Sequence, residues 1–216
     1  MESAAARDME FEFTDRDFEF LREIVTSHTG ITLAGHKRQL VYGRLTRRLR
    51  QLQLDTFAQY CAYVEQHLND ELGELVNAIT TNLTSFFREN HHFEHLAQHA
   101  LPDRMDRNGH NRRLRIWSAG CSTGEEPYTI AMTVSETLGT NLAVWDTRIL
   151  ATDIDSQVLA RAANGVYPDD RIESVAPARQ RRWFKHGKGP NAGKVKVMET
   201  LQSLITFKQL NLMNDS

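Results

Sequence analysis

The sequence predicts two domains: a small all-α domain, followed by a Rossmann-like α/β domain with a small antiparallel β-insertion. Three observations lead to this prediction. Apolar residues recur at helical spacing up to about residue 100, and a polar segment without an apolar period follows at 102–113. Short apolar runs then alternate with helical patterns from residue 114 to residue 164, which is the order of elements in a parallel sheet covered by helices.

The all-α domain is expected to span residues 14–100, after a flexible N-terminus at 1–13. Its first helix should begin at Thr14, because Thr14 and Asp17 have the spacing of a capping box. Gly30 is expected to end this helix, since glycine is the usual residue just after a helix C-terminus. Further helices follow up to residue 100.

The α/β domain is expected from residue 114 to the last residue, after a linker at 101–113. Its expected strands and helices lie at 114–118, 128–138, 147–152 and 156–164. The alternation breaks at 166–204, where a glycine-rich stretch precedes a strand-like segment, so we expect a small antiparallel β-subdomain there. Residues 205–210 are expected to form one more strand of the main sheet.

The composition is that of an ordinary globular protein and excludes several classes of function. The 216 residues are 40% hydrophobic and 25% charged. No apolar run reaches the roughly 18 residues that a membrane span needs, and the N-terminal segment lacks the layout of a signal peptide. With a net charge of −2, the chain as a whole does not attract nucleic acid. We therefore expect a cytoplasmic protein without membrane insertion and without nucleic acid as its partner.

The segment 114–128 (LRIWSAGCSTGEEPY) carries the strongest signal for a ligand site. An apolar strand leads into a turn of small residues, Gly120, Ser122 and Gly124, which lets a ligand approach the backbone. The turn opens a helix, whose first amide groups point toward that ligand. Two carboxylates, Glu125 and Glu126, follow where a phosphate-binding loop would have none.

The acidic residue at the end of the next strand, Asp153, is placed to accept hydrogen bonds from ribose hydroxyls. A dinucleotide is the obvious alternative, but its fingerprint needs G-x-G-x-x-G and an acidic residue about 20 positions later. Here Asp153 follows Gly124 by 29 positions. A pyrophosphate would also be repelled by the two glutamates. A cofactor with an ammonium group would be attracted, which favours S-adenosylmethionine.

Several long segments, taken in order, resemble the chemotaxis receptor methyltransferases, the CheR family. They are NLTSFFRE at 82–89 with HHF at 91–93, WSAGCSTGEEPY at 117–128 and ATDID at 151–155. The resemblance implies a class I methyltransferase fold in the α/β domain. It also implies methyl transfer from S-adenosylmethionine to glutamate side chains of chemoreceptors, with S-adenosylhomocysteine as the second product.

The resemblance further implies roles for individual residues. Arg88 is the candidate catalytic residue, because an arginine can hold a carboxylate through two parallel hydrogen bonds. Glu126 would bind the methionine ammonium and Asp153 the ribose. The complete set of implied cofactor-binding residues is Asn82, Thr84, Arg88, Glu126, Asp153, Asn211 and Leu212. The last two would lie near the adenine.

Two regions are predicted to contact the receptor. The block 37–50 is basic without any acidic residue, and its arginines Arg44, Arg47, Arg48 and Arg50 would steer the acidic methylation region of a receptor, although a solvated helix face remains the alternative. The glycines Gly187, Gly189 and Gly193 resemble the loop of family members that dock a receptor C-terminal tail peptide by strand addition. The family pattern continues beyond the last residue of this chain, so a C-terminally incomplete chain is expected.

Less specific interpretations stay open beside these. A non-catalytic docking module of the same fold is the main alternative function, and a nucleic-acid methyltransferase is a weaker one. His91 and His92 suggest no metal site, because no further Cys or His completes one. Cys121 is interpreted as a small buried filler, Asp155 as a helix N-cap, and Phe86 and Phe87 as core packing between the domains.

Overall fold

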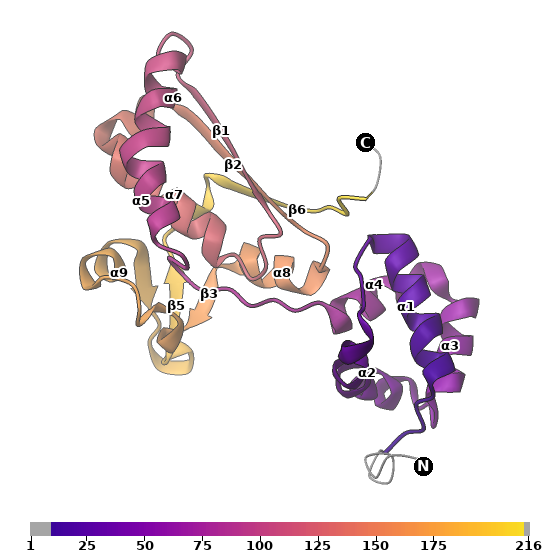
Figure 1. The fold of residues 1–216 in the computed structure, drawn as a ribbon. Coiled ribbons are helices and arrows are strands. Elements are labelled where there is room, and N and C mark those ends of the chain that lie inside the picture. The colour runs from indigo at the N-terminus through magenta and orange to yellow at the C-terminus, as the bar shows by residue number, and fades with distance from the viewer. Residues whose placement is uncertain (1–9, 214–216) are drawn as a thin grey trace. The chain divides into compact units, whose positions relative to one another are not determined.

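The computed structural model describes residues 10–213. It consists of two compact units, Met1–Thr81 with Asn211–Ser216, and Asn82–Leu210. Within the described residues, none of the helices is long and apolar enough to cross a membrane. The first unit is helical, and the second contains both sheets (Figure 1).

Among its described residues, the first unit contains four α-helices: α1 (Asp15–Thr29), α2 (Arg38–Leu52), α3 (Phe57–Gln66) and α4 (Leu68–Ile79). The predicted capping box is confirmed, because Thr14 Oγ1 accepts from the amide of Asp17 and the Asp17 carboxylate accepts from the amide of Thr14. Gly30 ends α1 with a left-handed φ of 72°. The apolar stripes predicted from the sequence meet in one core around Leu21, Leu45, Tyr60 and Leu75, which are buried.

The predicted flexible N-terminus at 1–13 is wrong for the residues that the structure describes. Residues 1–9 lie outside the described range, but Phe11 and Phe13 are buried at 9% and 6% exposure. The Phe13 ring lies 4.2 Å from that of Phe57, between ring centroids, and Glu12 forms a β-bridge with Thr56. Burial of these aromatic rings holds the segment against the helices.

The second unit is built on a parallel sheet in the order β1-β2-β6, formed by β1 (Arg113–Ala119), β2 (Asp146–Asp153) and β6 (Ile205–Gln209). Helix α7 (Glu125–Leu138) connects β1 to β2, and α8 (Ser156–Asn164) follows β2. The alternating strand and helix pattern predicted from the sequence is therefore confirmed. Because the strands are parallel, the ends of β1 and β2 lie at the same edge, with Ala119 paired to Thr152.

The segment predicted as a linker, 101–113, belongs to the second unit instead. Helix α5 (His91–His95), the π-helical segment η3 (Leu96–Ala100) and α6 (Leu101–Asn108) run into β1. The compact units divide between residues 81 and 82. In helix α6 only Leu101 is buried, and the remaining residues of the helix are mostly charged, which led the sequence interpretation to a linker.

The predicted antiparallel β-subdomain is present between residues 166 and 197. Its strands β3 (Val166–Pro168), β4 (Phe184–His186) and β5 (Lys194–Val197) pair antiparallel in the order β3-β5-β4. Helix α9 (Pro177–Trp183) precedes β4, and Trp183 and Phe184 are buried. The remaining short helices are η2 (Gly35–Lys37), η4 (Gly139–Val144), η5 (Asp169–Ile172), η6 (Gly189–Asn191) and α10 (Glu199–Gln202).

Candidate functional site

The turn from β1 to α7 has the backbone that its small residues predict. Gly120, Ser122 and Gly124 all have positive φ, at 74°, 50° and 95°. A Cβ on Gly124 would lie 2.8 Å from the Cβ of Ala162 in α8, so only glycine fits there. A Cβ on Gly120 would meet nothing within 4 Å, so that side of the turn faces open space.

Asp153, at the end of β2, accepts a hydrogen bond from this turn. Its Oδ2 accepts from the amide of Ser122 at 2.7 Å, and its Oδ1 accepts from the amide of Asp155 at 3.0 Å. Asp153 is buried, and each carboxylate oxygen retains a second acceptor position. Asp155 caps α8 by accepting from the amides of Gln157 and Val158, which confirms its predicted role. Contact of Asp153 with a ribose stays a prediction.

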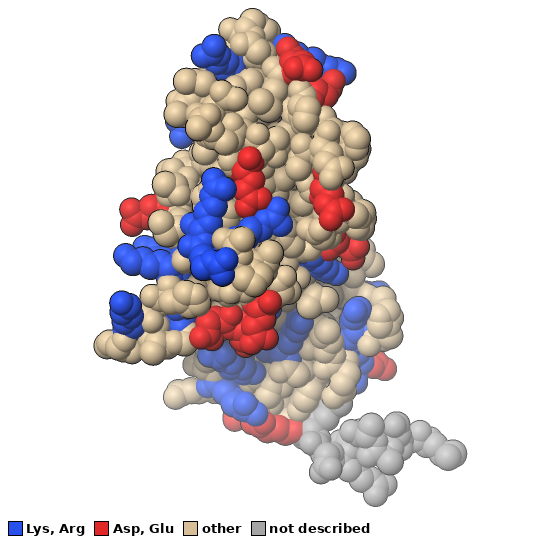
Figure 2. Space-filling view, turned by 90° about the vertical axis from the view of Figure 1, so that its left-hand side faces the viewer, with Lys and Arg blue, Asp and Glu red and all other residues tan. Residues whose placement is uncertain are grey.

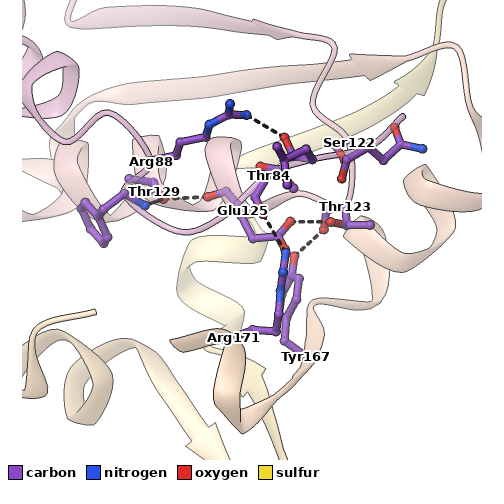
Figure 3. A network of polar contacts seen from close by, with 11 residues as sticks. Thr84, Arg88, Ser122, Thr123, Glu125, Thr129, Tyr167 and Arg171 are labelled. Atoms are coloured by element: carbon purple, nitrogen blue, oxygen red, sulfur yellow. Dashed lines mark hydrogen bonds and ion pairs between the residues drawn. The ribbon is translucent and has the colours of Figure 1, made fainter. Parts of the chain in front are cut away.

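The segment 82–89 is bound to the same turn by hydrogen bonds from several elements. The side-chain amide of Asn82 donates to Asp155 at 2.9 Å, and the Ser122 hydroxyl donates to the carbonyl of Asn82 at 3.3 Å. Farther along, the amide of Phe87 donates to the Thr129 hydroxyl of α7 at 3.2 Å (Figure 3). Phe86 is buried with its ring edge-on to those of Tyr167 and Phe184, so it packs in the core of the second unit, whereas packing between the domains was predicted.

The two glutamates at the start of α7 have different surroundings. Glu125 is 1% exposed; it forms an ion pair with Arg171 and accepts from the Thr123 hydroxyl at 2.6 Å. Glu126 is exposed, and its Oε1 accepts from the Ser118 hydroxyl at 2.6 Å. Only Glu126 of the two lines the cavity described next.

A cavity of about 600 Å³ lies between the turn, the segment 82–89 and the helix that follows it. Thr84, Arg88 and Glu126, three of the residues predicted from the sequence, line it. Its remaining polar lining includes Glu89, His92, His95, Gly120 and Ser122. The histidines were not predicted as site residues, because no sequence signal shows which side of α5 faces the turn.

Cys121 lies beside this cavity but is buried, at 1% exposure. Burial, reinforced by the negative charge of Asp153, raises the pKa of its thiol to about 12. A thiol with such a pKa stays protonated at neutral pH, so the structure supports its interpretation as a filler. The described residues contain no group of three or more His, Cys, Asp or Glu arranged to hold a metal ion.

Comparison with known proteins decides the family. Residues 16–80 match the CheR methyltransferase all-alpha domain, and residues 82–216 match the CheR methyltransferase SAM binding domain. The chain belongs to the CheR methyltransferase family. It is 50% identical over 209 residues to "Chemotaxis protein methyltransferase 2" of Pseudomonas aeruginosa. The aligned region covers 94% of this chain and 70% of that protein. It is 43% identical over 203 residues to "Chemotaxis protein methyltransferase" of Escherichia coli, with coverage of 93% and 67%.

S-adenosylmethionine is the cofactor of this CheR-family domain, and the lining of the cavity fits it. The cavity has the size of an ordinary small-molecule site. The Glu126 carboxylate supplies a negative charge for an ammonium or sulfonium group, and Thr84 supplies a hydroxyl. Gly120 leaves its side of the turn open to a ligand, as the space around its missing side chain shows.

Three of the four arginines predicted to contact a receptor have partners inside the helical unit of this CheR-family chain. Arg44 donates to the carbonyls of Ile79 and Thr80 at the end of α4, at 2.5 and 2.6 Å. Arg48 pairs through two hydrogen bonds, at 2.9 and 2.5 Å, with a glutamate of α4, Glu71, that is 1% exposed. The other two arginines are exposed: Arg50 pairs with Glu10, and Arg47 forms no ion pair with any described residue. Contact of these arginines with a receptor stays a prediction.

Asn211 and Leu212 are not among the described residues that line the cavity. The side-chain amide of Asn211 donates to the carbonyl of His28 at 2.7 Å, and Leu212 is 65% exposed. Both residues group with the helical unit. Their position near an adenine therefore stays a prediction.

The predicted receptor-tail loop lies between β4 and β5, next to a groove of about 450 Å³. The groove is basic, because Lys185, Lys188, Lys194 and Lys196 line it. Gly189 and Gly193 have positive φ, and a Cβ on Gly187 would overlap the carbonyl of Asn191. Residues 174–198 contain seven Lys and Arg and no acidic residue, a signal that the sequence interpretation missed. In the space-filling view, basic side chains gather in groups on the face shown (Figure 2).

Proposed function

We propose that this chain transfers a methyl group from S-adenosylmethionine to glutamate side-chain carboxylates of chemoreceptors, forming glutamate methyl esters. Membership of the CheR family supports methyl transfer in chemotaxis. The observation that carries the finer proposal is the cavity, in which an exposed carboxylate, Glu126, and an arginine, Arg88, line the same space. One group can hold the cationic donor, and the other can hold an anionic acceptor.

The chemistry requires little from acid or base groups. A glutamate carboxylate is already a nucleophile at neutral pH, so no general base is needed. The donor supplies an electrophilic methyl on a cationic sulfur; the bond to the acceptor oxygen forms as the bond from methyl to sulfur breaks, leaving S-adenosylhomocysteine. The residues of the chain therefore act by orienting two bound molecules and by excluding water from opposite charges held close together.

Arg88 is the residue we assign to the acceptor carboxylate. Its Nη1 donates to the carbonyl of Leu83 at 2.7 Å, which holds the side chain back against its own segment (Figure 3). A guanidinium has five N–H donors, so other donors remain for a two-point contact with a carboxylate. The side chain is exposed and lines the cavity, so an entering acceptor can reach it.

The partner in this proposal is the cytoplasmic part of a chemoreceptor, and a cytoplasmic location belongs to the same proposal. Arg47 is the arginine of α2 best placed to attract an acidic receptor region, since it is exposed and no described residue pairs with it. The basic groove beside Gly187 supports the proposal that a receptor tail docks on the β-subdomain.

Transfer of a labelled methyl group tests the proposed activity. Purified chain is incubated with labelled S-adenosylmethionine and a chemoreceptor cytoplasmic domain, and separately with RNA and with DNA. We expect label on the receptor alone, and its release as methanol in mild base, because carboxyl esters are base-labile. A non-catalytic docking module would instead bind the receptor without label transfer. Label on RNA or DNA would contradict the proposal.

Replacement of Arg88 tests its assigned role. We expect R88A to lower the rate of methyl transfer by at least about tenfold, because the acceptor loses its two-point contact. Arg161→Ala, which removes an exposed arginine from α8 of the same unit, is the control and should change the rate by less than about twofold. Rates of R88A equal to those of the control would exclude this role.

A further inference from the structure

Arg171 joins the two walls of the cavity, although it comes from the β-subdomain. It lies in η5, directly after β3, in a region that the sequence linked only to receptor binding. Its Nη2 donates to the carbonyl of Thr84 at 2.8 Å and also forms the ion pair with Glu125. One nitrogen atom therefore contacts both the segment 82–89 and the first residue of α7 (Figure 3).

Further hydrogen bonds continue from this contact. The Thr123 hydroxyl donates to Glu125 at 2.6 Å, and the hydroxyl of Tyr167 in β3 donates to the carbonyl of Thr123 at 2.7 Å. The Thr129 hydroxyl donates to the carbonyl of Glu125 at 2.7 Å while it accepts from the amide of Phe87. The β-subdomain, the turn and the segment 82–89 thus share one network.

The energetics make Arg171 the essential member of this network. Glu125 is 1% exposed, and a buried carboxylate without a cationic partner is strongly unfavourable. The Arg171 side chain is 41% exposed, so the carboxylate of this ion pair is buried while the guanidinium is accessible to solvent. Arg171 is not among the described residues that line the cavity, so it acts on a ligand only through Thr84 and the turn.

We propose that Arg171 is a positioning residue for the S-adenosylmethionine site. It fixes the carbonyl of Thr84, whose residue lines the cavity, against Glu125, the neighbour of Glu126. Without Arg171 the two walls lose their common contact, and the affinity for the cofactor falls. This inference rests on the cofactor site of the proposed function, but not on the identity of the methyl acceptor.

The test measures the dissociation constant of S-adenosylmethionine by calorimetry on the full chain, without any receptor. Arg171→Met keeps the length of the side chain and removes its donors; we expect the Kd to rise about tenfold, which is about 1.4 kcal/mol. Arg171→Lys keeps a cation, and because both contacts come from one nitrogen, we expect it to restore the Kd to within about threefold of the original.

The matched control is Arg115→Met. Arg115 is 43% exposed, close to the exposure of Arg171, and it likewise contacts a backbone carbonyl and a carboxylate, both of Asp146. Neither residue is among the described residues lining the cavity. We expect R115M to change the Kd by less than about twofold. The melting temperature of each variant without ligand shows whether it folds; if R171M does not, Glu125→Gln combined with R171M removes the unpaired buried charge and takes its place.

Each outcome decides the inference. An unchanged Kd in R171M, an equal rise in R171M and R115M, or no rescue by lysine would overturn the positioning role while the cofactor site stands. Absence of S-adenosylmethionine binding by the original chain would overturn the cofactor site and the inference together. A rise in Kd in R171M that lysine reverses and R115M does not share would support the inference.

Discussion

Glu125 and Glu126 are adjacent in the sequence, but their carboxylates have opposite surroundings. Successive residues of a helix point about 100° apart, so only one of two neighbours can face a given side. The sequence indicated that carboxylates at this turn favour a cationic ligand, and the resemblance to the CheR family implied that Glu126 binds the ammonium. The sequence could not reveal the partner of Glu125, because Arg171 lies 46 residues further along the chain, in the β-subdomain.

Glu136 also interacts with residues far along the chain, and the effect of these interactions on stability can be tested by varying the pH. Its carboxylate accepts from Arg179 at distances down to 2.8 Å and from the indole N–H of Trp183 at 2.8 Å. Burial alone would raise the pKa of Glu136, but the hydrogen bonds and the positive charge of Arg179 outweigh it and lower the pKa below the ordinary value of 4.5. The folded state therefore favours the ionised carboxylate.

The expected pH dependence follows from this direction. A carboxyl whose pKa is lower in the folded state stabilises the fold above its unfolded pKa of 4.5, and the contribution is lost as the pH falls through the folded pKa. We expect the difference in unfolding free energy between the original chain and Glu136→Gln to be constant above about pH 6 and to shrink below 4.5. The three tryptophans, at 117, 145 and 183, all lie in the second unit, so their fluorescence during urea unfolding measures it. A difference that stays constant to about pH 3 would contradict the expectation.

Among the elements, those with a clear period or cap were predictable. The capping box of α1 and the strand, turn and helix at 114–138 each follow from local sequence, and the structure has them. Helix α6 was missed because it buries only one residue, and the segment 10–13 was missed because its burial depends on rings from α2 and α3. Local patterns carry no information about such distant partners.

Helix α2 also has polar side chains whose distant partners could not be predicted from local sequence. Leu45 and Leu49 are buried in the core of the helical unit, whereas Arg47 is exposed. The sequence predicted Arg48 as a contact for a receptor, whereas the structure pairs Arg48 with Glu71, which also accepts from the hydroxyl of Tyr60 at 2.9 Å. Arg48 is therefore required to neutralise a carboxylate inside the helical unit.

Loss of Arg48 should destabilise the helical unit. We expect Arg48→Ala to lower its unfolding free energy by about 3 kcal/mol, because Glu71 remains buried without a cation. The same change at exposed Arg47 should cost less than about 0.5 kcal/mol. Far-ultraviolet circular dichroism in urea reports both units, and subtracting the transition seen by tryptophan fluorescence isolates the helical one. Equal losses in the two variants would show that the pair does not stabilise the unit.

At the scale of the molecule, the role of the β-subdomain differs from the one that the sequence suggested. The β-subdomain was expected to serve a receptor tail only. Yet Tyr167 and Arg171 of this region contact the turn and the segment 82–89 through hydrogen bonds. The order of strands and helices revealed the subdomain but not this contact, because the side chains that reach the turn carry no local motif.

Hydrogen exchange with and without S-adenosylmethionine tests where the ligand acts. A ligand at 100 times its Kd stabilises the state that binds it by about 2.7 kcal/mol, so amides that exchange by opening the site should exchange more slowly. We expect slower exchange at 82–89 and 119–131 and unchanged exchange in α1 and α3. Slower exchange at 210–213 would support the predicted role of Asn211 and Leu212, and unchanged exchange would argue against it.

Glu126→Gln at the same ligand concentration should show weaker protection, since the cavity loses its carboxylate for the ammonium group. Full protection in that variant would exclude the assigned role of Glu126.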